Sequence, residues 1–65
     1  MNNHIKAMRT ARGWSQEALG ELLDVSRQTV ISIERGKYDP SLPLAFKLAR
    51  VFECTIEDLF DPEDD

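Results

Sequence analysis

Apolar residues recur along the chain at helical spacing, and glycine and proline divide the pattern into short pieces. The spacing predicts helices over residues 3–12, 15–23, 26–35 and 42–52, with a short fifth helix that begins at residue 55. No segment alternates strictly between apolar and polar residues, so no strand is expected. The pattern therefore indicates a compact all-α domain of five helices.

Capping residues mark the beginnings of the second and third helices. Ser15 and Ser26 each precede an apolar stripe, where a hydroxyl can accept hydrogen bonds from the free amides of the first turn. Trp14 and Val25 stand one residue earlier, where each can pack against an apolar residue four positions into its helix. Gly36 is placed to end the third helix in the left-handed conformation. Two capped helices joined by so tight a turn are typical of a helix-turn-helix.

Charge is unevenly distributed along the 65 residues, whose formal net charge is −4. Residues 1–38 hold six Lys or Arg against four Asp or Glu, whereas residues 39–65 hold two against eight. A chain of this length accommodates one domain, which we assign to residues 1–60. The acidic residues 61–65 have nothing apolar to bury and are expected to form a frayed tail. Any basic surface must therefore be local.

Several classes of function find no support in the composition. No apolar run approaches the ~20 residues of a membrane span, and the start lacks the pattern of a signal peptide, so a cytoplasmic location is expected. His4 and Cys54 are each the only residue of their type, which leaves no nucleophile with a visible base and no metal-ligand cluster. We therefore expect no enzyme, no metal, no cofactor and no small-molecule ligand. Cys54 is interpreted as a buried apolar residue, with a redox role as the alternative.

The third predicted helix presents polar side chains suited to reading DNA. At about 100° per residue, Val30 and Ile33 face the core. Gln28 and Ser32 face the opposite way, with Arg27 on one flank. Arg27 can donate two parallel hydrogen bonds to guanine, Gln28 can form a bidentate pair with adenine, and Ser32 is short and adaptable. Such residues are also ordinary on a solvated helix, but the paired caps and the tight turn favour the DNA-reading interpretation.

The chain resembles the phage-repressor-like (Xre/Cro-type) helix-turn-helix family in the string SQEALGELLDVSRQTVISIERGKYDPSLPLAFKLARVFECTIEDLF. More narrowly, it resembles small single-domain prokaryotic transcriptional regulators, over about residues 5–60. The resemblance implies a repressor-like DNA-binding domain whose second and third helices form the reader. It implies base contacts from Arg27, Gln28 and Ser32. It implies phosphate contacts from Gln16, Arg35, Lys37 and the loop amides near Tyr38. It also implies a partly buried ion pair between Arg9 and Glu34 with a structural role.

The sequence departs from the family pattern at three places. Asp24 occupies the turn position usually held by glycine, and Glu53 stands where glycine often follows the fourth helix. The loop after the third helix is poor in cations, because it holds Lys37 but also Asp39. Gly20 fits the pattern, since a small residue lets the second and third helices approach closely.

Together these features predict a sequence-specific DNA-binding transcriptional regulator that reads the major groove of double-stranded DNA with the helix starting at Ser26. One copy covers little DNA, so a homodimer is expected, at least on DNA. Leu42, Phe46 and Phe60 are the candidates for its surface, because a core this small has limited room. The alternative is a helix-turn-helix scaffold that acts through protein–protein contacts, as an antitoxin or a partner-binding subunit.

Overall fold

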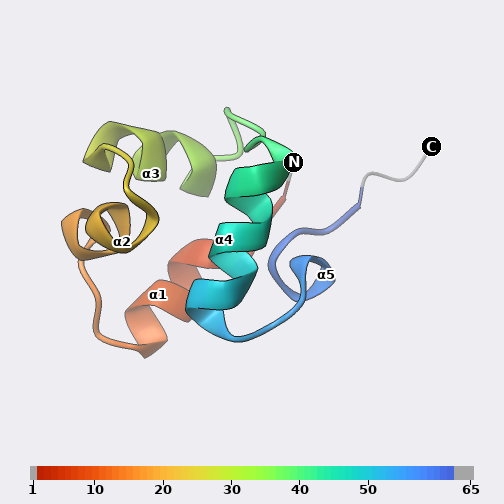
Figure 1. Ribbon diagram of the computed structural model, residues 1–65, viewed down its shortest axis with the longest axis horizontal. Coiled ribbons are helices and arrows are strands. Elements are labelled where there is room, and N and C mark those ends of the chain that lie inside the picture. The colour runs from red at the N-terminus through yellow and green to blue at the C-terminus, as the bar shows by residue number, and fades with distance from the viewer. Residues whose placement is uncertain (1, 63–65) are drawn as a thin grey trace.

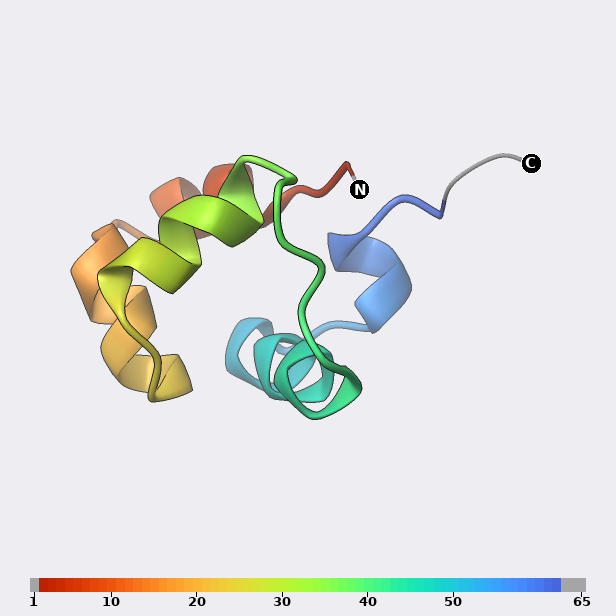
Figure 2. The ribbon, with the colours of Figure 1, turned by 90° about the horizontal axis from the view of Figure 1, so that it is seen from above.

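The five-helix prediction is confirmed by the computed structural model, which describes residues 2–62. The helices are α1 (Ile5–Ala11), α2 (Gln16–Leu23), α3 (Arg27–Glu34), α4 (Leu42–Phe52) and α5 (Ile56–Leu59). In Figure 1, α4 runs through the middle of the molecule, with α2 and α3 on one side and α5 on the other. Figure 2 shows the extended segment that leads from the end of α3 to the start of α4. The pair α2 and α3 therefore lies at the end of the molecule away from α5.

The core is built around one face of α4. Leu48 and Phe52 are 0% and 1% exposed, and every other helix contributes to the same cluster. The remaining apolar members of this cluster are Ile5, Leu19, Leu23, Val30, Ile33, Ala45, Ala49, Leu59 and Phe60. One expectation changes here, since Phe60, a candidate for the dimer surface, belongs to the core and is not available to a partner. Leu22, on α2, is half exposed.

Local hydrogen bonds fix the turn between α2 and α3, and they confirm the predicted caps. The hydroxyls of Ser15 and Ser26 accept from the third amide of each helix, at 3.0 and 3.1 Å. Asp24 adopts the left-handed conformation with φ 59° and ψ 44°. A Cβ on Gly20 would lie 2.8 Å from the carbonyl oxygen of Val25. Glycine is therefore required here because the backbone of the turn, rather than α3, approaches α2 closely.

The two ends of the described chain are joined. Asn3 and Phe60 form an isolated antiparallel bridge, and the amide of Asp61 donates to the carbonyl of Asn2 at 2.9 Å. Oδ1 of Asp61 also lies 3.0 Å from Nε2 of His4. Asp61 is thus held against the domain, although it was predicted to begin the frayed tail. Residues 63–65 of that predicted tail lie outside the described residues.

Candidate nucleic-acid interface

Helix α3 presents two kinds of surface. Val30 and Ile33 are only 1% and 2% exposed and anchor the helix in the core, as its periodicity predicts. Arg27 and Gln28, at the amino end, are exposed, and Ser32 is partly exposed one turn further on. The buried side chains of Val30 and Ile33 therefore fix α3 so that its polar row faces outward. The first residues of that row, Arg27 and Gln28, lie at the amino end of α3, directly after the turn.

An uncharged hollow lies along one flank of α3. It is lined by Ser26, Gln28, Thr29, Ser32 and Tyr38. Every one of these side chains ends in a hydroxyl or an amide, so the hollow offers hydrogen-bond donors and acceptors without net charge. Tyr38, predicted near a phosphate, has its side chain here beside the two candidate base-reading residues Gln28 and Ser32, and it is 44% exposed.

A second hollow, on the opposite flank of α3, is cationic. It is lined by Lys6, Gln16, Arg27, Ile31, Glu34 and Arg35. We refer to it as the cationic hollow. It brings together two residues expected at phosphates, Gln16 and Arg35, with Arg27, which was expected at bases. Lys37, the other cation expected at phosphates, is exposed and lines neither of these two hollows.

A buried ion pair ties α1 to α3 beneath the cationic hollow. Nε of Arg9 donates to Oε2 of Glu34 at 2.6 Å, and Nη2 of Arg9 donates to Oε1 at 3.2 Å. The side chains of this pair are 9% and 4% exposed. Nη1 of Arg9 also donates to the carbonyl of Trp14, and Nε2 of Gln16 donates to Oε1 of Glu34 at 3.1 Å. This network fixes both the position of α3 and the orientation of the Gln16 amide.

Sequence reasoning missed Lys6. Nothing in the helical pattern separates it from an ordinary solvated lysine, because its proximity to α3 depends on how α1 packs. Arg12, the C-cap residue of α1, is already used in contacts within the protein. Its Nη2 donates to the carbonyl of Phe52 at 2.8 Å, and its guanidinium lies 5.0 Å from the centre of the Phe52 ring.

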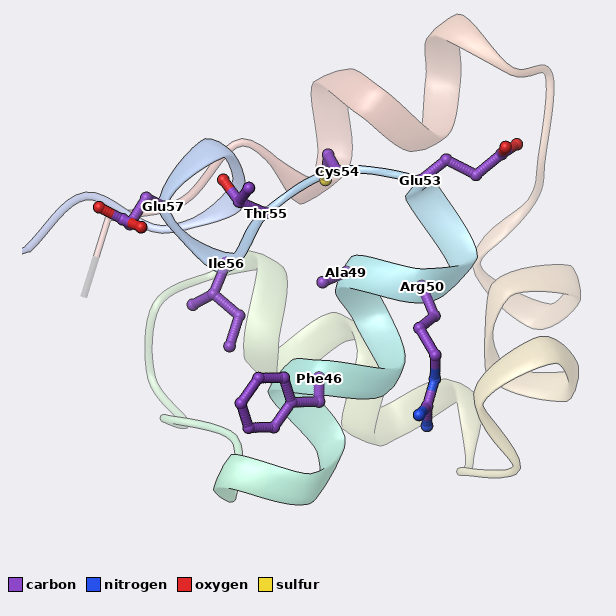
Figure 3. A pocket seen from close by; sticks show the side chains of 8 residues that line it. All are labelled: Phe46, Ala49, Arg50, Glu53, Cys54, Thr55, Ile56 and Glu57. Carbon is purple, nitrogen blue, oxygen red and sulfur yellow. The ribbon is translucent and has the colours of Figure 1, made fainter.

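The face formed by α4 and α5 is a further exposed surface. Leu42 and Phe46 are 65% and 52% exposed. Figure 3 shows Phe46 and Ile56 converging on one groove. The groove also has Arg50 and the acidic residues Glu53 and Glu57 among its lining residues. It thus combines an apolar floor with charges of both signs.

Two ionisable groups near this groove have shifted pKa values. Burial raises the pKa of the Cys54 thiol, with a further contribution from the Asp58 carboxylate, while the Arg12 guanidinium opposes the shift. Cys54 is only partly buried, so its predicted role as a buried apolar residue holds in part. The backbone amide of Thr55 donates to Asp58 and lowers the pKa of that carboxyl. This bond is half of a capping box formed by Thr55 and Asp58 at the start of α5.

The geometry is that of a helix-turn-helix domain, and comparison with known proteins identifies the family. The helix-turn-helix family matches residues 5–59. The chain therefore belongs to the Xre/Cro-type helix-turn-helix family, and the resemblance found in the sequence is confirmed. Among residues 2–62, no helix is long and apolar enough to cross a membrane, and no group of three potential ligands could hold a metal ion.

Relatives and solved structures agree with this assignment. An uncharacterized HTH-type transcriptional regulator of Methanocaldococcus jannaschii is 55% identical over all of this chain and 98% of its own length. YgzD of Bacillus subtilis, named in the same way, is 50% identical over 92% of this chain and 91% of its own. The restriction-modification controller protein C.AhdI of Aeromonas hydrophila superposes with a TM-score of 0.77, at 38% identity, covering 86% of this chain and 85% of its own.

Proposed function

We propose that this DNA-binding transcriptional regulator reads its operator by laying the amino end of α3 in the major groove. The observation that carries the proposal is the outward row on α3, in which Arg27 and Gln28 are exposed while Val30 and Ile33 are fixed in the core. A major groove admits an α-helix, and helix-turn-helix proteins read bases with the first residues of their second helix. The function proposed is one of binding and not of catalysis.

The two hollows support a division of roles between the flanks of α3. Gln28 and Ser32, from the uncharged hollow, are proposed to contact bases, because amides and hydroxyls discriminate by hydrogen-bond pattern. Arg27 is proposed to reach a base from the cationic side, where a guanidinium can pair with guanine. The proposed phosphate contacts are Gln16, Arg35, Lys37 and the loop at Tyr38.

We further propose that the regulator acts as a homodimer through the α4–α5 face. A two-fold interface must be complementary to itself. The groove supports this proposal, because its lining holds Arg50 with Glu53 and Glu57, whose opposite charges could pair between two copies around an apolar centre at Phe46. The 52% exposure of a phenylalanine at this centre supports coverage by a partner. The proposed location is the cytoplasm, as expected for a prokaryotic DNA-binding regulator.

Selection of sites from a random DNA pool tests the function. The expected product is an inverted repeat with half-sites about one helical turn apart. On the selected site, Arg27→Ala should cost roughly 1–3 kcal/mol of binding free energy and relax one base preference. Lys37→Gln is the matched comparison, because loss of a phosphate contact weakens all sequences alike. An unselective pool, with no preferred site, would contradict the proposal.

The dimer has its own test. Phe46→Lys should shift the protein to the monomer in sedimentation and weaken binding to the full inverted repeat, without changing the helical circular dichroism. Leu22→Lys is the control, since it places the same charge on another half-exposed apolar residue. A monomeric wild type that binds a protein partner and no specific DNA would instead support the scaffold alternative.

A further inference from the structure

The cationic hollow contains a lysine from outside the helix-turn-helix. Lys6 lies on α1, yet it lines the same depression as Gln16 and Arg35. We propose that Lys6 completes a binding site for a single phosphate of the DNA backbone, formed jointly with Gln16 and Arg35. The inference rests on the proposed DNA binding and adds to it a third element of the fold, α1, in direct contact with the duplex.

Charge is the first argument. The hollow has three cationic side chains, Lys6, Arg27 and Arg35, and one carboxylate, Glu34. Both oxygens of Glu34 accept hydrogen bonds from Arg9, and its side chain is 4% exposed. The only anion of the hollow is therefore already neutralised. In a chain with a net charge of −4, this is a local concentration of positive charge suited to an anionic ligand.

The availability of these cations is the second argument. Within the described part of the chain, Lys6, Arg27 and Arg35 have no ion pair with a carboxylate. Arg9 and Arg12, by contrast, are both used inside the protein. The basic residues of α1 and its C-cap therefore have different roles. Arg9 and Arg12 hold the fold, and Lys6 is left to act on a partner.

The Gln16 amide supplies a neutral donor to the same site. One of its N–H groups donates to Oε1 of Glu34, and an amide nitrogen carries a second N–H. Because a carboxylate only accepts, the nitrogen of Gln16 must face Glu34, which fixes the orientation of the amide. The second N–H is then held ready for a phosphate oxygen. A compact ammonium at Lys6 serves as a point charge, which suits backbone anchoring without base readout.

Salt dependence is the first test of the Lys6 contact. Each phosphate neutralised contributes about 0.9 to the slope of log K against log salt. Because Arg35 still faces the same phosphate, two copies of Lys6→Gln should reduce the slope by at most about 1.8. Between about 50 and 200 mM salt, wild-type affinity should therefore fall more than that of the variant, by a factor of at most about 12. Lys47→Gln, on α4 and outside the cationic hollow, removes the same charge and should leave the slope unchanged. Equal slopes for the Lys6 and Lys47 variants would overturn the proposal.

Methylphosphonates, which are uncharged replacements for backbone phosphates, locate the contact. They are placed singly along each strand of the selected site. One position in each half-site should weaken wild-type binding more than it weakens Lys6→Gln binding, because Gln16 and Arg35 still contact that phosphate in the variant. If every substitution weakens both proteins equally, Lys6 contacts no particular phosphate and the proposal fails, while the proposed function stands. Absence of any specific site for the wild type would instead be a failure of the proposed function. Saturable, Lys6-dependent binding of inorganic phosphate alone would make this a small-anion site and overturn the assignment to DNA.

Discussion

Removal of one member of the Arg9–Glu34 pair should be far more damaging than removal of both. In Glu34→Leu, Arg9 loses two of its three hydrogen bonds to acceptors and keeps only the carbonyl of Trp14. Its charge stays in a site where the side chain is 9% exposed. Breaking a buried pair in this way costs about 3–5 kcal/mol, because the remaining charge is uncompensated. A domain of this size is stable by roughly 3–5 kcal/mol, so the single variant should be largely unfolded.

The double variant separates the cost of the orphaned charge from the value of the pair. Arg9→Met with Glu34→Leu leaves no buried charge, and apolar replacement of buried pairs is often neutral or stabilising by about 1–4 kcal/mol. Urea unfolding is followed by circular dichroism and by the fluorescence of Trp14, the only tryptophan, whose ring packs 5.5 Å from Phe52. Destabilisation of Glu34→Leu alone by less than about 1 kcal/mol, the range typical of exposed pairs, would contradict a buried and uncompensated Arg9 charge.

Three further predictions concern the backbone and one carboxylate. Glu53→Gly should stabilise the domain by about 0.5–1 kcal/mol in thermal unfolding, because Glu53 is held at φ 55°, a left-handed conformation that is unfavourable for residues other than glycine. The gain for Asp24→Gly should be smaller, since aspartate tolerates that conformation better. Gly20→Ala should destabilise by about 1–3 kcal/mol in urea, as its Cβ would require the backbone at Val25 to move; an undiminished midpoint would contradict this. The pKa of Asp58 is lowered in the folded state, so its stabilisation is complete above the unfolded value near 3.8 and is lost as pH falls through the folded pKa. Acid titrations of wild type and Asp58→Asn should therefore differ in unfolding free energy at neutral pH and converge at low pH.

Local features of the sequence were sufficient for the helices and for the outward row of α3. Ser15 and Ser26 act as caps because their hydroxyls reach amides three residues away, an interaction that depends on no distant segment. The faces of α3 follow from the helical period in the same way, and Val30 and Ile33 are buried accordingly. The fold class and the candidate base-reading residues could therefore be predicted before any packing was known.

Features that depend on distant contacts could not be predicted. Lys6 lies in the cationic hollow only because α1 packs beside α3, which is some twenty residues further along the chain. Phe60 was predicted as a candidate for the dimer surface. It is buried instead, at the end of α5, where its backbone forms a bridge with Asn3. Gly20 was correctly expected to permit a close approach, but the atom approached, a carbonyl of the turn, depends on the path of the backbone.

Direct readout by α3 is best tested by removing single acceptors from the major groove. Replacing purines of the selected site one at a time by their 7-deaza analogues deletes N7, which only the major groove presents. We expect one adenine in each half-site whose 7-deaza analogue weakens wild-type binding by about 1–3 kcal/mol and leaves binding by Gln28→Ala unaffected. If no 7-deaza substitution changes wild-type affinity, or if Gln28→Ala responds to every substitution as the wild type does, α3 does not read the major groove through Gln28.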